Sequence, residues 1–147
     1  MFIHKIFHLR QPLNEAREHL RSARTWTASE QEALVHCAAT DSGIFGHLEF
    51  KTRHGEPIAA DIEEIPGDEP DRILFRSRNG DVDLVGVIEL FPIRANLTEA
   101  VLTIEYEAPS VMQKAIERIS VGIDQFLNRQ LARIERARVG EAAGLCA

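Results

Sequence analysis

The sequence predicts an α+β fold in which a curved antiparallel sheet of about seven strands wraps around one long C-terminal helix. Short segments that alternate apolar and polar residues recur through the chain, with turn signals between them, as half-buried strands do. The last long segment, Ser110 to Arg138, instead repeats apolar residues at intervals of three and four, which is typical of an amphipathic helix. The expected order is one strand, one helix, about six strands and then the long helix.

The chain opens with a predicted strand that leads into a predicted helix. Within Phe2–Leu9, the side chains of Ile3, Phe7 and Leu9 share one face. Pro12 suits the first turn of a helix, where no backbone N–H is needed. The apolar positions that follow at helical spacing are Leu13, Ala16, Leu20 and Ala23.

The middle of the chain is a series of short strands. The predicted strands are Ala33–Ala38, Ile44–Lys51, Ile58–Glu63, Ile73–Arg78, Asp81–Phe91 and Leu102–Glu107. Asn79-Gly80 is a favoured two-residue hairpin turn, and a loop is expected from Arg94 to Thr98. Strands that are joined by short turns form an antiparallel meander, and its apolar face must be buried.

The closing helix is the element that is left to cover that face. Ser110 and Gln113 have the spacing of a capping box at its start. Its apolar stripe consists of Met112, Ala115, Ile116, Ile119, Ile123, Phe126, Leu127 and Ile134. We therefore expect residues 1–138 to form a single domain, and residues 139–147, which are small and contain glycine, to form a flexible tail.

Length and composition restrict the class of protein. A chain of 147 residues has the length of one domain. Its 17 basic and 23 acidic side chains give a net charge of −6, so no basic surface for nucleic acid is expected. No apolar run approaches the length of about 20 residues that a bilayer requires, and no signal-peptide pattern is present. Cys37 and Cys146 are expected to be reduced thiols in a cytoplasmic protein.

Several segments resemble those of a known superfamily. They are HLRQPLNEAREHL, then Trp26, then SGIFGHLEF and HGEPIAADIEE, and finally VLTIEYEAP followed by the long helix. In this order they are similar to the START-like (SRPBCC) superfamily, whose fold is also called the helix-grip or polyketide cyclase/dehydrase fold. The resemblance covers nearly the whole chain at the level of pattern and assigns no subfamily. It implies a cavity for lipids, sterols, quinones, polyketides or plant hormones, in proteins that are carriers, regulatory domains or cyclases.

The sequence predicts a ligand site between sheet and closing helix, because both surfaces are apolar at matching periods. The residues expected to line it are Leu84, Ile88, Ile104 and Tyr106 from the sheet, and Met112, Ile116 and Ile119 from the helix. The expected ligand is small and hydrophobic or amphipathic, such as a lipid, a quinone or a polyketide. No cofactor is predicted, and the sequence neither predicts nor excludes a homodimer.

Two other functions are weighed beside binding. A cyclase or dehydratase would need an acid–base group inside the cavity, and the candidates are Tyr106, His36, Arg76 and Lys5. The chain has neither a GxSxG nucleophile motif nor a glycine-rich phosphate loop. An interaction module with a filled core would work through an exposed apolar surface instead.

A metal site is not predicted. His4 and His8 lie on one face of a strand, but four residues of strand separate them by about 13 Å. His36 and His47 come from neighbouring strands, so they would meet only in one pairing register. The chain has no HExxH motif, which would place two ligands on one helix face.

Overall fold

The computed structural model describes the backbone of residues 2–21, 34–40, 43–51, 57–80, 82–107 and 113–136, and the side chains of residues 2–21, 60–80, 82–107, 124–125 and 127–136. Its elements in chain order are β1 Phe2–Leu9, α1 Leu13–Arg21, β2 Leu34–Thr40, β3 Gly43–Lys51, β4 Pro57–Ile65, β5 Arg72–Gly80, β6 Asp83–Arg94, β7 Leu97–Glu107 and α2 Gln113–Arg136. The predicted α+β class, with an antiparallel sheet and two helices, is confirmed. The predicted tail, residues 139–147, lies outside the described residues.

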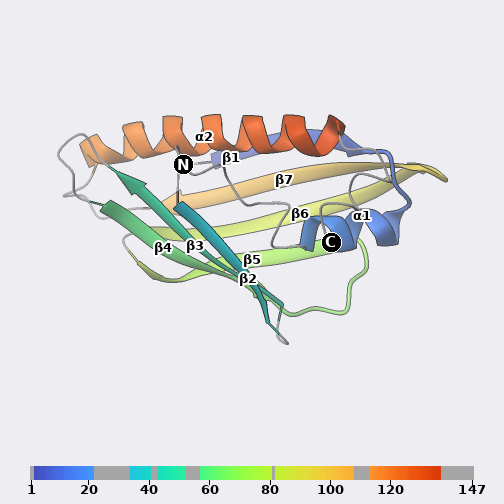
Figure 1. Cartoon of the computed structure of the whole chain (residues 1–147), viewed down its shortest axis with the longest axis horizontal. Helices are drawn as coiled ribbons and strands as arrows, with labels where there is room; N and C mark the ends of the chain where they lie inside the picture. The colour runs from blue at the N-terminus through green and yellow to red at the C-terminus, as the bar shows by residue number, and fades with distance from the viewer. Residues whose placement is uncertain are drawn as a thin grey trace.

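The strands pair in one sheet in the order β1-β7-β6-β5-β4-β3-β2, and every pair is antiparallel. Strands β2 to β7 follow one another as a meander, because each connection only has to reverse the chain. Strand β1 does not join its successor; it pairs with β7, where Phe2 faces Glu105 and Leu9 faces Thr98. The first strand therefore lies beside the last strand and α2 at one edge of the sheet (Figure 1).

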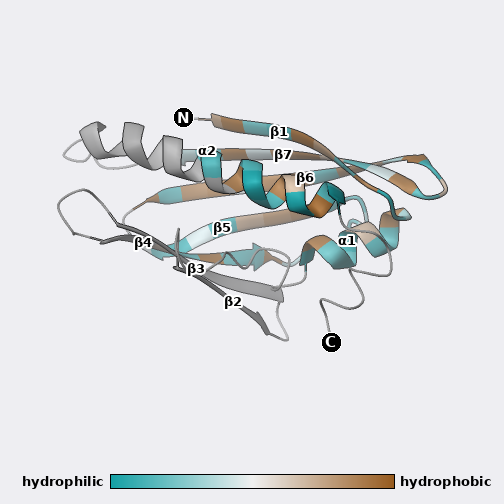
Figure 2. Ribbon diagram, turned by 45° about the horizontal axis from the view of Figure 1, so that its top comes forward, coloured by the Kyte–Doolittle hydropathy of each residue, from teal (hydrophilic) through white to brown (hydrophobic). Residues whose placement is uncertain are grey.

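One face of the sheet carries the core, and we call it the inner face. Burial alternates along β6 and β7, so every second side chain is removed from water. The buried apolar residues of the inner face are Ile3, Phe7, Leu9, Ile73, Leu84, Ile88, Leu90, Ala100, Leu102, Ile104 and Tyr106. The helices add Ala16, Leu20, Leu127, Leu131 and Ile134 to the same cluster. Both helices therefore contribute to the core on one side of the sheet, and the strands that Figure 2 colours by hydropathy alternate brown and teal.

Two polar contacts fix α2 along the edge strand β1. Lys5 of β1 forms an ion pair with Asp124 of α2, with 2.5 Å between Nζ and Oδ1. The backbone N–H of His8 donates a hydrogen bond to Oε1 of Glu135 at 3.0 Å. An edge strand exposes unpaired N–H groups that invite pairing with another chain. Helix α2 therefore covers part of this edge as well as part of the core.

The structure corrects two predicted turns. Asn79 and Gly80 do not form a two-residue hairpin turn, because they continue β5 and pair with Asp61 and Ala60 of β4. A register shift in β4 after Asp61 and a φ of 130° at Gly80 allow this extension. The loop expected from Arg94 to Thr98 is also shorter than predicted, because β6 ends at Arg94 and β7 begins at Leu97.

Candidate functional site

A row of inner-face residues crosses the sheet and leads from a polar end to an apolar end. Cross-strand pairing joins Glu64 to Phe75, Phe75 to Gly86, Gly86 to Ile104, and Ile104 to Ile3. We call these five residues the Glu64 row. Neighbouring strands lie about 4.8 Å apart, so the backbones of Glu64 and Ile104 are separated by about 14 Å. A span of this length could accommodate the extended alkyl chain of a lipid-sized molecule, not only a single functional group.

The centre of the row has an unusually close contact. The ring of Phe75 lies over Gly86, where a side-chain Cβ built on the glycine would come within 2.1 Å of the ring's Cζ. Glycine is therefore needed at this position, because any larger residue would displace the ring. Phe75 itself is partly buried against the core. The aromatic ring thus forms the floor between the polar end of the row and Ile104.

The four predicted sheet residues lie together on the inner face. Leu84 faces Tyr106 across the strands, next to the Glu64 row, and Ile88 faces Leu102. All four side chains are buried in the core. The backbone N–H of Leu84 also donates a hydrogen bond to Oγ of Ser77 at 2.9 Å, which ties β6 to β5.

The predicted helix residues are described less fully. Ile116 and Ile119 fall within α2, in the half for which the backbone alone is described. Met112 lies outside the described residues. The contacts of these three side chains with the sheet therefore stay a prediction.

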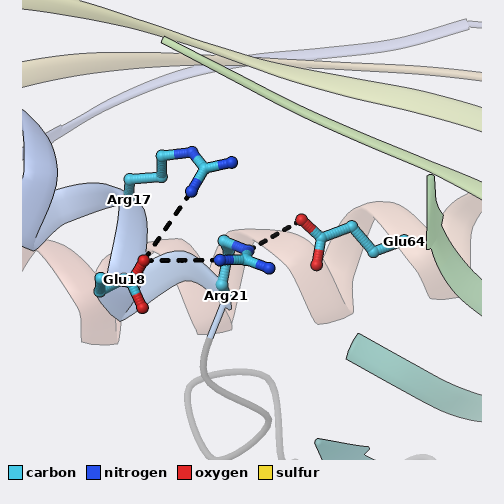
Figure 3. Close-up of polar contacts among 4 residues, drawn as sticks. All are labelled: Arg17, Glu18, Arg21 and Glu64. Carbon is cyan, nitrogen blue, oxygen red and sulfur yellow. Dashed lines mark hydrogen bonds and ion pairs between the residues drawn. The ribbon is translucent and has the colours of Figure 1, made fainter. Parts of the chain in front are cut away.

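A part-buried ion pair between Arg21 and Glu64 closes the polar end of the row. Nε of Arg21, the last residue of α1, donates a hydrogen bond to Oε1 of Glu64 at 2.8 Å. The side chain of Glu64 is only 5% exposed and that of Arg21 is 30% exposed. The hydrogen bond to Glu64 is the main cause that raises the pKa of Arg21, so the guanidinium keeps its positive charge. Figure 3 shows the two side chains pointing toward each other.

Arg17 lies beside this pair with fewer partners. It precedes Arg21 by one helical turn, so both arginines extend from the same face of α1. Its Nη1 is 3.8 Å from Oε1 of Glu18, the only ion pair that the described residues give it, and Glu18 is 70% exposed. Its Nε is buried and has no hydrogen-bond partner in the described part of the chain. Figure 3 shows Arg17 extending from α1 on the side where Glu64 lies.

Helix α2 contributes a second buried polar atom without a partner. The side chain of Gln130 is buried, and its Oε1 accepts no hydrogen bond from any residue that the structure describes. Buried polar groups almost always find a partner, and an exception calls for an explanation such as a water molecule or a ligand. Each helix therefore brings one unsatisfied polar group to the covered side of the sheet.

His19 marks the contact between α1 and the C-terminal part of α2. Its Nδ1 lies 3.0 Å from Oε1 of Gln11. Burial lowers the pKa of His19 below its ordinary value of 6.5, and the positive charge of Arg133 on α2 lowers it further. The folded protein therefore favours the neutral imidazole.

This shift predicts a stability that depends on pH. Because the unfolded chain binds a proton at His19 more readily than the folded chain, the free energy of unfolding is expected to fall as the pH decreases from 6.5. His19→Gln removes the titrating group, so the variant should lose less stability than the wild type over this range. Urea unfolding at about pH 7.5 and about pH 5 measures the difference. Equal losses in the two proteins would contradict the assignment to His19.

The four acid–base candidates have separate surroundings. Tyr106 is buried on the inner face, and Lys5 is occupied by Asp124. Arg76 lies on the outer face, where its Nε donates a hydrogen bond to Oε1 of Glu63 at 3.1 Å, so it does not enter the interior. His36 belongs to β2, where the backbone alone is described.

The remaining histidines do not form a described metal site. The register places His36 opposite His47, and His47 opposite Asp61. His4 and His8 have separate partners on the outer face, Thr103 and Glu99. Among residues whose side chains are described, no group of three or more histidine, cysteine, aspartate or glutamate side chains could hold a metal ion.

Sequence reasoning missed the polar end of the site. Ile58, Ala60 and Ile62 alternate on one face of β4, and the same phase continues to Glu64. Arg17 and Arg21 flank the apolar stripe of α1. A charged residue at a position where the strand or helix pattern predicts burial was the signal that could have found this end. The contact between Arg21 of α1 and Glu64 of β4, however, cannot be predicted from either segment alone.

Comparison with known proteins gives the fold. No protein-family model matches the chain, and no curated protein matches it. Solved structures do match. A protein from Thermus thermophilus is 17% identical, with a TM-score of 0.67, and the match covers 91% of this chain and 97% of that one. None of the helices that the structure describes is long and apolar enough to cross a membrane.

Two further structures carry descriptive names. The Zhui aromatase/cyclase from a Streptomyces species is 18% identical, with a TM-score of 0.63 and coverage of 95% of this chain and 97% of that one. A START superfamily protein from Mycobacterium smegmatis is 12% identical, with a TM-score of 0.58 and coverage of 90% and 98%. At these identities the similarity establishes the fold alone. The chain has the START-like fold, and the resemblance seen in the sequence is confirmed.

Proposed function

We propose that this protein binds a small hydrophobic or amphipathic ligand between the inner face of the sheet and α2. The observation that supports the proposal most is the Glu64 row, in which a part-buried ion pair adjoins an apolar surface. A mostly apolar lining with a few placed polar groups is typical of small-molecule sites. Binding would be driven by burial of apolar surface, at about 25 cal/mol per Å².

The proposed site lies under the N-terminal half of α2. The ion pair of Lys5 with Asp124 and the buried side chains of Leu127 and Leu131 attach the C-terminal half to the core. The N-terminal half follows β7 closely in the chain, since β7 ends at Glu107 and α2 begins at Gln113. We place the apolar part of the ligand under this half of the helix. We further propose that residues 1–138 form one helix-grip domain and that the protein acts in the cytoplasm. The proposed lining is Leu84, Ile88, Ile104, Tyr106, Met112, Ile116 and Ile119.

The proposal is tested by native mass spectrometry and by displacement of a fluorescent apolar probe. Freshly purified protein is expected to retain a lipid-sized mass or to bind the probe with saturation. Ile104→Trp fills the site, so we expect it to weaken probe binding by about tenfold. Val85→Trp is the matched control, because Val85 lies on the same sheet but is 57% exposed on the outer face. Loss of binding in the control alone, or no saturable binding in the wild type, would contradict the proposal.

An enzyme of the cyclase or dehydratase type is the second candidate. The part-buried Arg21–Glu64 pair and the likeness to an aromatase/cyclase structure favour it. Tyr106 is the proposed acid–base group. Turnover of a supplied polyketide-like substrate that Tyr106→Phe slows would support this function. Binding of the same compound without any change in its mass or absorbance would instead favour simple binding.

A further inference from the structure

We infer that the bound molecule is an amphipathic carboxylic acid and that Arg17 is the residue that receives its acidic group. The inference rests on the proposed binding site and assigns the chemical class of its ligand. It follows from the charge balance of the covered polar cluster, from the geometry of the guanidinium group, and from the position of Arg17 relative to the Glu64 row.

The cationic side chains on the covered side of the sheet differ in how closely an acidic partner neutralises their charge. Arg21 donates to the buried carboxylate of Glu64 at 2.8 Å, and Lys5 contacts Asp124 at 2.5 Å. Arg17 has a side chain that is only 18% exposed, yet its ion-pair partner Glu18 is 3.8 Å away and 70% exposed. Water screens so distant and exposed a partner. Arg17 is therefore a largely buried cation whose charge is not neutralised within the described residues.

The guanidinium has a carboxylate-binding edge whose buried Nε–H lacks an acceptor. Arg17 uses Nη1 toward Glu18, whereas its buried Nε–H has no acceptor among the side chains and backbone that the structure describes. In a planar guanidinium, the Nε–H and one N–H of Nη2 point the same way and match the two oxygens of a carboxylate. A bidentate anion at this edge would satisfy the buried donor and balance the charge in one contact. A neutral hydroxyl or a water molecule would satisfy the donor alone.

The site's geometry suggests where the rest of the molecule lies. Arg17 and Arg21 are one turn apart on α1, and Arg21 contacts Glu64 at the start of the row. An acidic group at Arg17 would direct an apolar body past Phe75 and Gly86 toward Ile104. The part of the row from Glu64 to Ile104 spans about 14 Å. The Glu64 carboxylate also disfavours an anion in its own place, because like charges repel in a covered environment. Arg17 is thus the anion-binding end, while Arg21 is reserved for Glu64.

The test compares two ligands of the same length that differ only in the head group. Lauric acid and lauryl alcohol are titrated into the full chain by isothermal calorimetry at neutral pH, with wild type and Arg17→Met. We expect the wild type to bind the acid about tenfold more tightly than the alcohol, and Arg17→Met to remove this preference while leaving the affinity for the alcohol within about twofold. Arg72→Met, which removes an exposed arginine of β5, is the matched control and should keep the preference.

The possible outcomes distinguish the inference about Arg17 from the proposed ligand-binding function on which it rests. Equal affinities of the wild type for acid and alcohol would overturn the inference and leave the proposed binding function in place. Binding of neither compound, together with no retained lipid-sized mass, would overturn both. A preference for the acid that persists in Arg17→Met would assign the acidic group to another cation and overturn the role of Arg17. The wild-type comparison needs no variant, so it is decisive even if Arg17→Met does not fold.

Discussion

Arg21→Met is expected to lower the free energy of unfolding by about 2–4 kcal/mol, because it leaves the buried carboxylate of Glu64 without its cation. The expected loss is below the largest values for buried pairs, since Arg21 itself keeps part of its contact with water. Urea unfolding at neutral pH, followed by circular dichroism, measures the change. Most of the loss arises from the buried charge that Glu64 retains after Arg21 is removed, rather than from the attraction between the two groups.

Removing both charges of the Arg21–Glu64 pair tests whether the charge left on Glu64 causes the loss of stability. Arg21→Met combined with Glu64→Leu replaces the pair with apolar side chains of similar size, so the double variant should recover most of the lost stability. Arg72→Met is the control for loss of an arginine, because the Arg72–Glu69 pair is exposed on both sides and should change stability by less than about 1 kcal/mol. A double variant as unstable as Arg21→Met would show that the pair is not the cause.

Gly86→Ala is expected to destabilise the protein by about 1–3 kcal/mol, because the new methyl group occupies the place of the Phe75 ring. The ring must turn away and give up part of its packing against the core. Thermal or urea unfolding detects the loss, and near-ultraviolet circular dichroism reports the changed aromatic environment. The result would show that the floor of the proposed site is closely packed.

A second substitution tests whether a clash with the Phe75 ring causes this loss of stability. In a Phe75→Leu background the space over Gly86 is less filled, so Gly86→Ala should cost clearly less than in the wild type. Gly67→Ala is the matched glycine control: no atom lies within 4 Å of its added Cβ, and its stability should change by less than about 1 kcal/mol. Equal costs of Gly86→Ala in both backgrounds would contradict a steric clash with Phe75.

The sequence predicted those parts of the fold that depend on local periodicity. Alternation along β6 placed Leu84 and Ile88 on the buried face, and it did the same for Ile104 and Tyr106 on β7. Turn chemistry was less informative. Asn79-Gly80 has the composition of a hairpin turn, but pairing with β4 and the register shift there extend β5 through it. Tertiary pairing thus overrode a local signal.

The polar end of the candidate site was beyond sequence reasoning for a different reason. Arg21 and Glu64 are 43 residues apart and meet only because α1 packs on β5, β6 and β7, from where the Arg21 side chain reaches β4. A charged residue beside an apolar stripe is usually solvated, so Arg17 gave no sign of its burial. What identifies these residues is an unsatisfied or paired charge in a covered place, which is a property of the assembled structure.

The pairing of β1 with β7 has a consequence for the order in which the protein folds. Phe2 pairs with Glu105, and the backbone of His8 is bonded to Glu135, which follows it by 127 positions. Strands β2 to β7 can form their hairpins as they leave the ribosome, whereas β1 has to wait until β7 has been synthesised. Such long-range closure is slow because its entropy is lost before its contacts form. Strand β1 is therefore expected to be among the last of the described strands to find its place.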